Sequence, residues 1–216
     1  MSKRALVNHR PWLLAGVISA LAFYFLWNNP IGGVWLILLK GSAVGFLAIY
    51  AWRRAPGTDG TILTIALLLS AIADMALELW FEIGGALFAA SHLVAVVLYL
   101  RNLREKPTGS QRLLAIALLI GVPAVAYLLS SRADIAAYAA ILGLMAACAW
   151  MSRFPRYRVG LGAVLFVLSD WLIFSREGAF DLAPFPDVLI WPLYFAGQLM
   201  IATGVVQTLR GEHPAR

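Results

Sequence analysis

Residues 61–79 read TILTIALLLSAIADMALEL, and Asp74 and Glu78 are the charged side chains in this stretch. A membrane-spanning α-helix needs about 20 mostly apolar residues. The stretch lacks the alternating pattern of a barrel strand, and an open sheet leaves backbone groups unsatisfied in lipid. It therefore predicts a transmembrane helix that carries a carboxylic acid within the membrane.

The rest of the 216-residue chain repeats this apolar character. Its composition is 62% hydrophobic and 13% charged, whereas soluble domains are about 45–50% apolar and about 25% charged. We predict an all-α, polytopic transmembrane helical bundle that forms one domain over residues 1–216. Its eight expected spans lie at about 11–27, 33–52, 61–79, 83–101, 112–130, 133–151, 158–174 and 188–209.

Loop charges predict the orientation. Alternate connectors and the two termini hold 14 of the 17 Lys and Arg residues, whereas the opposite connectors hold only Arg132 and Arg176. The positive-inside rule then places both termini in the cytoplasm. Residues 20–22 resemble a signal-peptidase site, but the apolar run continues to Trp27, so we expect an uncleaved first span.

Two compositional features narrow the function. The net charge of +6 lies beside spans, where it sets topology, so we expect no nucleic-acid partner. Cys148 is the single cysteine, which excludes a disulfide within the chain. Small residues at helix-packing spacing, Gly41 with Gly45 and Gly197 with Gly204, are expected to let helices approach closely.

Four ionisable residues lie inside predicted spans: Lys40, Asp74, His92 and Asp170. A charge at the bilayer centre costs at least ~2.5–3.5 kcal/mol, so such residues usually face a protein interior and carry function. At 1.5 Å per residue, the Lys and the two Asp lie about 6–10 Å below the outer end of their spans. His92 lies near the midplane.

Further polar residues fall in the same layer. Tyr194 and Gln198 are four residues apart and share a helix face, and Glu78 is one turn beyond Asp74. The spans at 11–27, 112–130 and 133–151 have no such group and are expected to be scaffold.

Structural interpretations remain open for each of these residues. Lys40 would then be a counter-ion for an Asp, the two Asp paired packing charges, and His92 a core residue bonded to a carbonyl. Tyr194 would belong to the interfacial aromatic belt, where most of the tryptophans are also expected. Gln198 would join helices.

The charge sum favours acid–base chemistry. Two Asp and one Lys leave one excess negative charge, and like carboxylates sharing a site do not both ionise easily. We therefore expect one protonated and one ionised Asp, the pairing used for general acid and general base. The chain lacks the G-x-S-x-G motif of serine hydrolases, and His92 with two Asp is a poor zinc site, so no metal is expected.

Together these motifs resemble the lysoplasmalogenase, or YhhN-like, family over about residues 36–205. The resemblance is carried, in order, by Lys40, Ser70-x-x-x-Asp74, Phe81-x-x-Gly84-x-x-x-Phe88-x-x-x-His92, Gly162-x-x-x-Phe166-x-x-Ser169-Asp170 and Tyr194-x-x-x-Gln198. The family pattern usually has Pro after the Lys and Gly before the first Asp, where this chain has Gly41 and Ala73.

The resemblance implies an eight-span hydrolase that cleaves the vinyl-ether bond of lysoplasmalogens, releasing a fatty aldehyde and a glycerophospho-base. Asp74 and Asp170 would be the catalytic pair, in a logic similar to that of glycosidases. The supporting or substrate-binding residues would be Lys40, Glu78, His92, Ser169, Tyr194 and Gln198. It implies a lysophospholipid substrate in the membrane lipid and no cofactor.

Other readings stay open. Intramembrane Asp, Lys and His also build proton-coupled transporters or permeases, and a non-catalytic lipid-binding scaffold would use the charges only to fix helix register. Short loops favour the bacterial inner membrane. A homo-oligomer, the head-group preference and the division of acid and base between the two Asp are left undecided.

Overall fold

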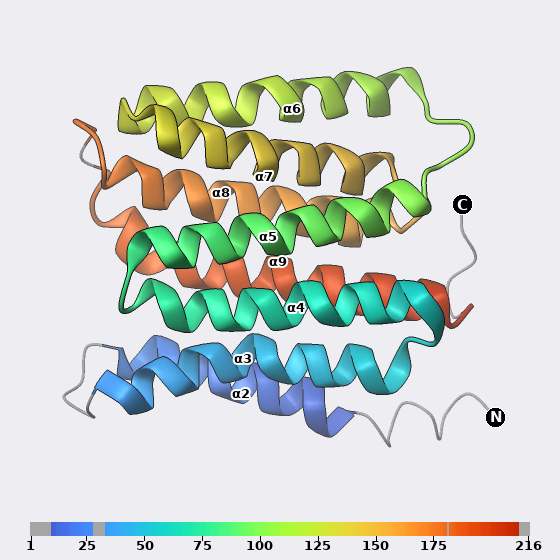
Figure 1. Cartoon of the computed structure of the whole chain (residues 1–216), viewed down its shortest axis with the longest axis horizontal. Coiled ribbons are helices and arrows are strands. Elements are labelled where there is room, and N and C mark those ends of the chain that lie inside the picture. Colours follow the sequence, from blue (N-terminus) through green and yellow to red (C-terminus); the bar gives the residue numbers. More distant parts are fainter. Residues whose placement is uncertain (1–9, 28–32, 181, 212–216) are drawn as a thin grey trace.

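The computed structural model describes residues 10–27, 33–180 and 182–211. Apart from an isolated bridge between Leu103 and Ser152, the regular structure in these residues is helical. The helices run antiparallel along the chain (Figure 1). They are α2 (Arg10–Leu26), α3 (Gly33–Arg54), α4 (Gly57–Leu77), α5 (Phe81–Arg101), α6 (Gly109–Ser130), α7 (Ala133–Met151), the π-helix η1 (Arg156–Gly160) leading into α8 (Leu161–Ser175), and α9 (Phe185–Leu209).

Each predicted span coincides with one of these helices, and the differences lie at the ends. α4 begins four residues early, directly after Pro56, which takes the extended conformation that proline favours. α6 begins three residues early because Thr108 and Gln111 form a capping box. A proline before α4 and a capping box before α6, not hydropathy, set these boundaries.

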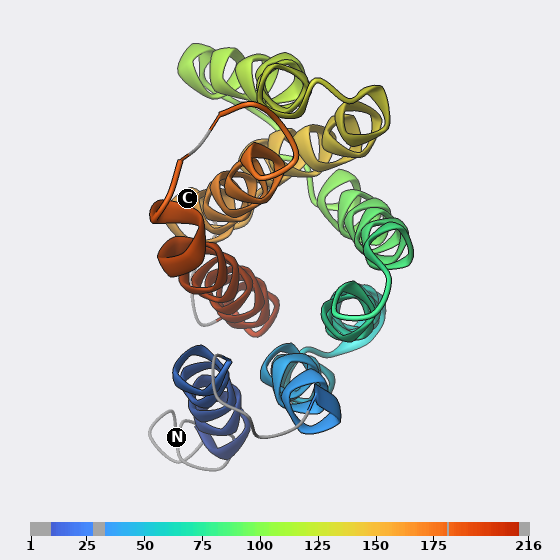
Figure 2. The same cartoon turned by 90° about the vertical axis from the view of Figure 1, so that its left-hand side faces the viewer.

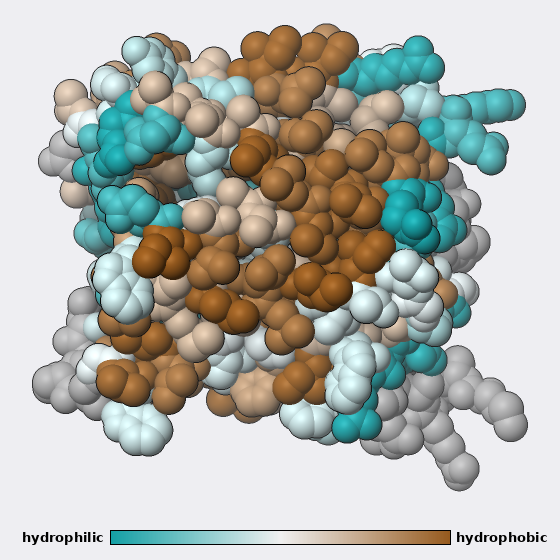
Figure 3. Space-filling model, viewed as in Figure 1, coloured by the Kyte–Doolittle hydropathy of each residue, from teal (hydrophilic) through white to brown (hydrophobic). Residues whose placement is uncertain are grey.

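The fold is a polytopic transmembrane helical bundle, which confirms the predicted class. Within the described residues, seven helical segments are long and apolar enough to cross a membrane, and the apolar helix in α2 is shorter. An apolar band crosses the middle of the surface, with hydrophilic residues at both ends (Figure 3). Exposed side chains such as Ile18, Leu113 and Leu128 face outward, as expected for contact with lipid.

The two ends of the bundle differ in charge. We call the end where α3, α5, α7 and α9 begin the outer end, because the loop charges predict that it faces away from the cytoplasm. At the opposite, inner end, Asp59 accepts hydrogen bonds of 2.8 Å from both Arg101 and Asn102, and Arg153 donates to Asn102 at 2.7 Å. This network joins α4 and α5 to the segment after α7.

The helices enclose a central space. α5 packs against α7, and α9 returns to pack against α3 and α4, so these helices and α8 surround the interior. Figure 2, which looks along the bundle from the outer end, shows this arrangement, with α2 beside α3 and α6 beside α7 on the outside. The candidate residues lie on the helices that surround this interior, α3, α4, α5, α8 and α9.

Close helix contacts at glycines fix the register. A Cβ at Gly41 would lie 2.5 Å from the Met75 side chain, and one at Gly204 would lie 2.7 Å from Val159, so both positions are packing sites as predicted. α3 continues unbroken through Gly41. The prediction for Gly45 is wrong, because no atom lies within 4 Å of its Cβ position.

Candidate active site

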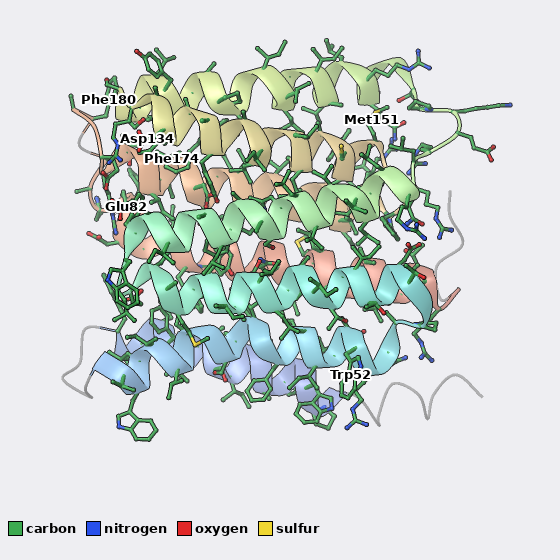
Figure 4. The ribbon with its side chains drawn as sticks, in the orientation of Figure 1. Trp52, Glu82, Asp134, Met151, Phe174 and Phe180 are labelled. Atoms are coloured by element: carbon green, nitrogen blue, oxygen red, sulfur yellow. The ribbon has the colours of Figure 1, made fainter. Side chains whose placement is uncertain are left out.

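A cavity of about 460 Å³ occupies the outer half of the bundle. Its walls include aromatic and aliphatic side chains such as Phe23, Phe88 and Ile173, and its rim is charged. Figure 3 shows a recess among hydrophilic side chains at this end. In Figure 4, Glu82, Asp134 and Phe174, which line the cavity from α5, α7 and α8, lie close to the outer end. The volume is within the ~300–1,000 Å³ of small-molecule sites.

Asp74 of α4 lines this cavity and is 2% exposed. The hydroxyl of Tyr194 on α9 donates to its Oδ2 at 2.6 Å. Tyr194 is therefore a partner of the carboxyl group and not a member of the interfacial belt. Trp191, one turn earlier, also lines the cavity and donates through Nε1 to the carbonyl of Ala20 at 2.9 Å, so its expected place in the belt is wrong.

Asp170 of α8 lines the same cavity and is 5% exposed. The hydroxyl of Tyr138 on α7 donates to its Oδ2 at 2.8 Å, and His92 Nε2 of α5 lies 3.2 Å from the same hydroxyl. Both carboxyl groups thus face one space, each with a tyrosine hydrogen bond from a different helix.

The contact between α8 and α9 explains how these side chains meet. A Cβ at Gly197 would lie 2.6 Å from the carbonyl oxygen of Gly162, so the two backbones touch. Two turns beyond Gly162, Ser169 Oγ donates to the carbonyl of Ile190 at 2.9 Å. Ser169 lines the cavity, but its hydroxyl serves this helix contact, which sets Asp170 beside α9.

Lys40 also lines the cavity, and its partner is Glu78. The Nζ to Oε1 distance is 2.5 Å, and the ammonium group lies 5.6 Å from the ring centroid of Phe23. The interpretation of Lys40 as the counter-ion of an Asp is not what the contacts show. Among the described residues, neither Asp74 nor Asp170 forms an ion pair with a basic side chain within 4.0 Å.

His92 and Gln198 lie outside the large cavity. Both line a separate space of about 20 Å³ together with Phe166. The ring of His92 lies 4.8 Å from that of Phe166, which in turn packs edge-on against Phe88 of the large cavity. Gln198 Nε2 donates to Ser70 Oγ at 3.1 Å, so its amide is occupied in joining α9 to α4.

Ion pairs hold the rim of the large cavity. Arg132 binds both carboxylate oxygens of Asp134 and also Glu177 at 3.0 Å, and Arg176 binds Asp187. The hydrogen bonds to Asp134 raise the pKa of Arg132 further above its ordinary value, so this residue stays a cation. Arg132 and Arg176, the only basic residues predicted for the outer connectors, thus both lie at the rim.

A model of the YhhN family matches residues 35–205 of this chain. The chain belongs to the YhhN family. This family includes lysoplasmalogenases. No curated protein and no solved structure gave a match.

The part of this YhhN protein that matches the family model contains every candidate residue, whereas α2 precedes it. α2 nevertheless contributes Phe23 and Tyr24 to the cavity wall, and Trp27, the residue after α2, also lines it. No group of three or more His, Cys, Asp or Glu side chains suited to a metal occurs among the residues that the structure describes.

Tyr138 is the site residue that the sequence reasoning missed. It lies on the span at 133–151, which was expected to be scaffold, and that expectation is wrong because its hydroxyl contacts Asp170. Its position, five residues into α7 and so about 8 Å deep, is the depth of the two Asp. This shared depth was the signal in the sequence that could have identified Tyr138 as a site residue.

Proposed function

We propose that this YhhN protein is an intramembrane hydrolase that cleaves the vinyl-ether bond of lysoplasmalogen-type ether lysolipids, with Asp74 and Asp170 as the acid–base pair. One observation carries the proposal. Two buried carboxyl groups, each hydrogen-bonded by a tyrosine, face a single apolar cavity with a charged rim. The family, which includes lysoplasmalogenases, supports the same chemistry.

The reaction uses each carboxyl group twice. The protonated Asp gives its proton to the β-carbon of the vinyl ether as the double-bond electrons form the new C–H bond, leaving an oxocarbenium ion. Water adds to this cation, and the ionised Asp takes the proton that water releases, giving a hemiacetal. The second Asp, now protonated, then donates to the ether oxygen of the hemiacetal, while the first Asp takes the proton of the hemiacetal hydroxyl. The aldehyde and the alcohol leave, and both residues return to their starting states.

The cavity suits a single-chain lipid with a polar head. Apolar side chains such as Phe23, Leu77 and Ile190 would contact the chain, and the rim arginines would lie near the phosphate. The reacting bond would sit between tail and head, at the depth of the two Asp. Lys40 and Glu78 would contact the polar part of the substrate.

The decisive experiment incubates the purified protein with lysoplasmalogen and with saturated-ether and ester lysolipids of the same chain length and head group. We expect aldehyde from the vinyl ether alone. Asp74→Asn and Asp170→Asn keep the size of each side chain and should each lower turnover by about 10²–10⁴, with unfolding temperatures close to that of the wild type. Glu105→Gln, an exposed change beyond α5, is the matched control.

Near-normal turnover in either Asn variant would refute the paired-acid mechanism. A transporter is the second candidate, favoured by the intramembrane contacts between His92, Tyr138 and Asp170. Against it, the residues that line the large cavity belong to the outer halves of their helices. Uptake of unchanged lysolipid into liposomes, with no aldehyde formed, would favour transport.

A further inference from the structure

Each of the two aspartates accepts a hydrogen bond from a tyrosine on another helix. Tyr194 lies 2.6 Å from Asp74, and Tyr138 lies 2.8 Å from Asp170. Both distances are ordinary for a hydroxyl group bonded to a carboxyl oxygen. The difference between the two pairs lies in what surrounds each of them.

The first difference is in the neighbouring charges. The ammonium group of Lys40 contacts Glu78, which lies one turn beyond Asp74 at the end of α4, so α3 brings a cation beside Asp74. Glu78 offsets part of that positive charge. The side-chain hydrogen bond to Asp170 comes from the neutral Tyr138. An adjacent cation favours an ionised carboxylate, so Asp74 has the better setting for a negative charge.

The environment of Tyr138 adds a second difference. The rings packed against Tyr194 are Phe88, Phe166 and Trp191, and none of these titrates. Tyr138 instead lies between two titratable groups, with its oxygen 2.8 Å from Asp170 and 3.2 Å from His92 Nε2. If Tyr138 donates to Asp170, then the imidazole must donate to Tyr138, which assigns the Nε2–H tautomer to a neutral His92.

The row of hydrogen bonds from His92 through Tyr138 to Asp170 becomes stronger when Asp170 loses a proton. A neutral carboxyl oxygen is a weak acceptor, whereas a carboxylate oxygen accepts a charge-assisted bond that is about twice as strong. Hydrogen bonds in a row also polarise one another. The donors on Tyr138 and His92 therefore stabilise charge that appears only as the proton leaves, which lowers the barrier for donation.

We infer that Asp170 is the acid and Asp74 the base of the reaction, and that His92 and Tyr138 are positioning residues that stabilise the Asp170 carboxylate as it forms. The inference rests on the proposed function. His92 lines the small space and not the large cavity, so it would act through Tyr138. The reaction steps given above then begin with transfer of the Asp170 proton to carbon and end with its return.

Chemical rescue separates the two roles. In Asp170→Ala, added formic acid should restore aldehyde release in proportion to its undissociated form, because the variant lacks a proton donor. In Asp74→Ala, the formate anion should restore it, because that variant lacks a base. Ser replacements at both positions provide a second pair of variants if Ala fails to fold. The reverse pattern of rescue would overturn the assignment.

A double-mutant cycle tests the chain of hydrogen bonds. Tyr138→Phe and His92→Leu should each lower kcat by about 10- to 100-fold, and the double variant by little more than either alone. All three should change the solvent deuterium isotope effect on kcat alike, a readout that loss of packing alone would not move. Tyr127→Phe, an exposed tyrosine on α6, is the control expected to keep wild-type values.

The outcomes distinguish the two proposals. A wild-type protein that releases no aldehyde from any vinyl-ether lipid removes the proposed function and the role assignment with it. If the wild type is active but the effects of the Tyr138 and His92 substitutions on kcat multiply in the double variant, the proposed hydrogen-bond chain is refuted and the proposed function is not. Multiplied effects are expected instead for Tyr138→Phe combined with Tyr194→Phe, because those residues serve different carboxyl groups.

Discussion

Replacement of Gly197 by Ala should separate α8 from α9 and so disturb the site. The new Cβ would lie 2.6 Å from the backbone carbonyl oxygen of Gly162, which is 0.8 Å short of the 3.4 Å at which ordinary contact begins. The obstructing atom belongs to a helix backbone and cannot rotate away. Relief therefore requires a shift of one helix relative to the other by most of an ångström.

The cost can be compared with a matched variant. Gly45→Ala also introduces an alanine into the middle of a helix, but no atom lies within 4 Å of its Cβ position. Both variants gain up to ~1 kcal/mol of helix propensity, so their difference isolates the clash. Overpacking costs about 1–3 kcal/mol, and we expect Gly197→Ala to be less stable than Gly45→Ala by that amount.

The assay is thermal unfolding in detergent, followed by tryptophan fluorescence, beside aldehyde release from lysoplasmalogen. Gly197→Ala should also lose activity about tenfold or more, because Asp170 and Tyr194 lie on the two helices that must move, and small misplacements of reacting groups are costly. Equal unfolding temperatures for the two variants would refute the claim that backbone contact at Gly162 fixes this register.

Two further predictions concern contacts around the site. Ser70→Ala removes the acceptor of Gln198 and the 2.8 Å partner of Ser91, so it should destabilise the protein by about 0.6–1.7 kcal/mol while largely preserving aldehyde release. Wild-type stability in chemical unfolding would contradict this. Trp191→Phe keeps an aromatic ring but loses the 2.9 Å bond to the Ala20 carbonyl. Backbone amides of α2 should then exchange hydrogen faster than in the wild type, while those of α6 keep their wild-type rates. Unchanged exchange in α2 would show that this bond does not hold the helix in place.

The sequence predicted the helices well because lipid leaves a chain few choices. Within hydrocarbon every backbone group must be satisfied internally, so an apolar run of about 20 residues becomes a helix. Prediction was less accurate at helix ends, where Pro56 and the capping box of Thr108 and Gln111 decide the boundary. Those signals are local and were present in the sequence.

The sequence predicted the depth of each candidate residue in the membrane, but not the direction in which its helix face points. Counting residues from the end of a span gives depth, and depth correctly placed Asp74, Asp170 and Tyr194 in one cavity. It does not give the direction in which a helix face points, which depends on contacts such as that of Gly197 with Gly162. His92 and Gln198 were placed near the right depth but line a different cavity.

The partner of Lys40 shows the same limit. A sum of formal charges treats all groups in a layer as equally close, and so paired Lys40 with an Asp. In the structure Glu78, one turn nearer the rim, is 2.5 Å away. Tyr138 escaped notice for a different reason, since a residue that is neutral at physiological pH does not enter a charge sum.

The hydrogen bonding of the buried polar groups separates structural from functional residues. The chain from Gln198 through Ser70 and Ser91 ends on the backbone carbonyl of Ala66 at 2.8 Å, so its donors are satisfied by the protein itself. Asp74 and Asp170 differ, because each has one side-chain hydrogen bond among the described residues, which leaves a second carboxyl oxygen for the cavity. A carboxyl group left incomplete in this way is costly inside a membrane protein. This cost is offset only when a substrate or water forms a hydrogen bond with the second carboxyl oxygen. For that reason Asp74 and Asp170, and not the serines at similar depth, are expected to carry the chemistry.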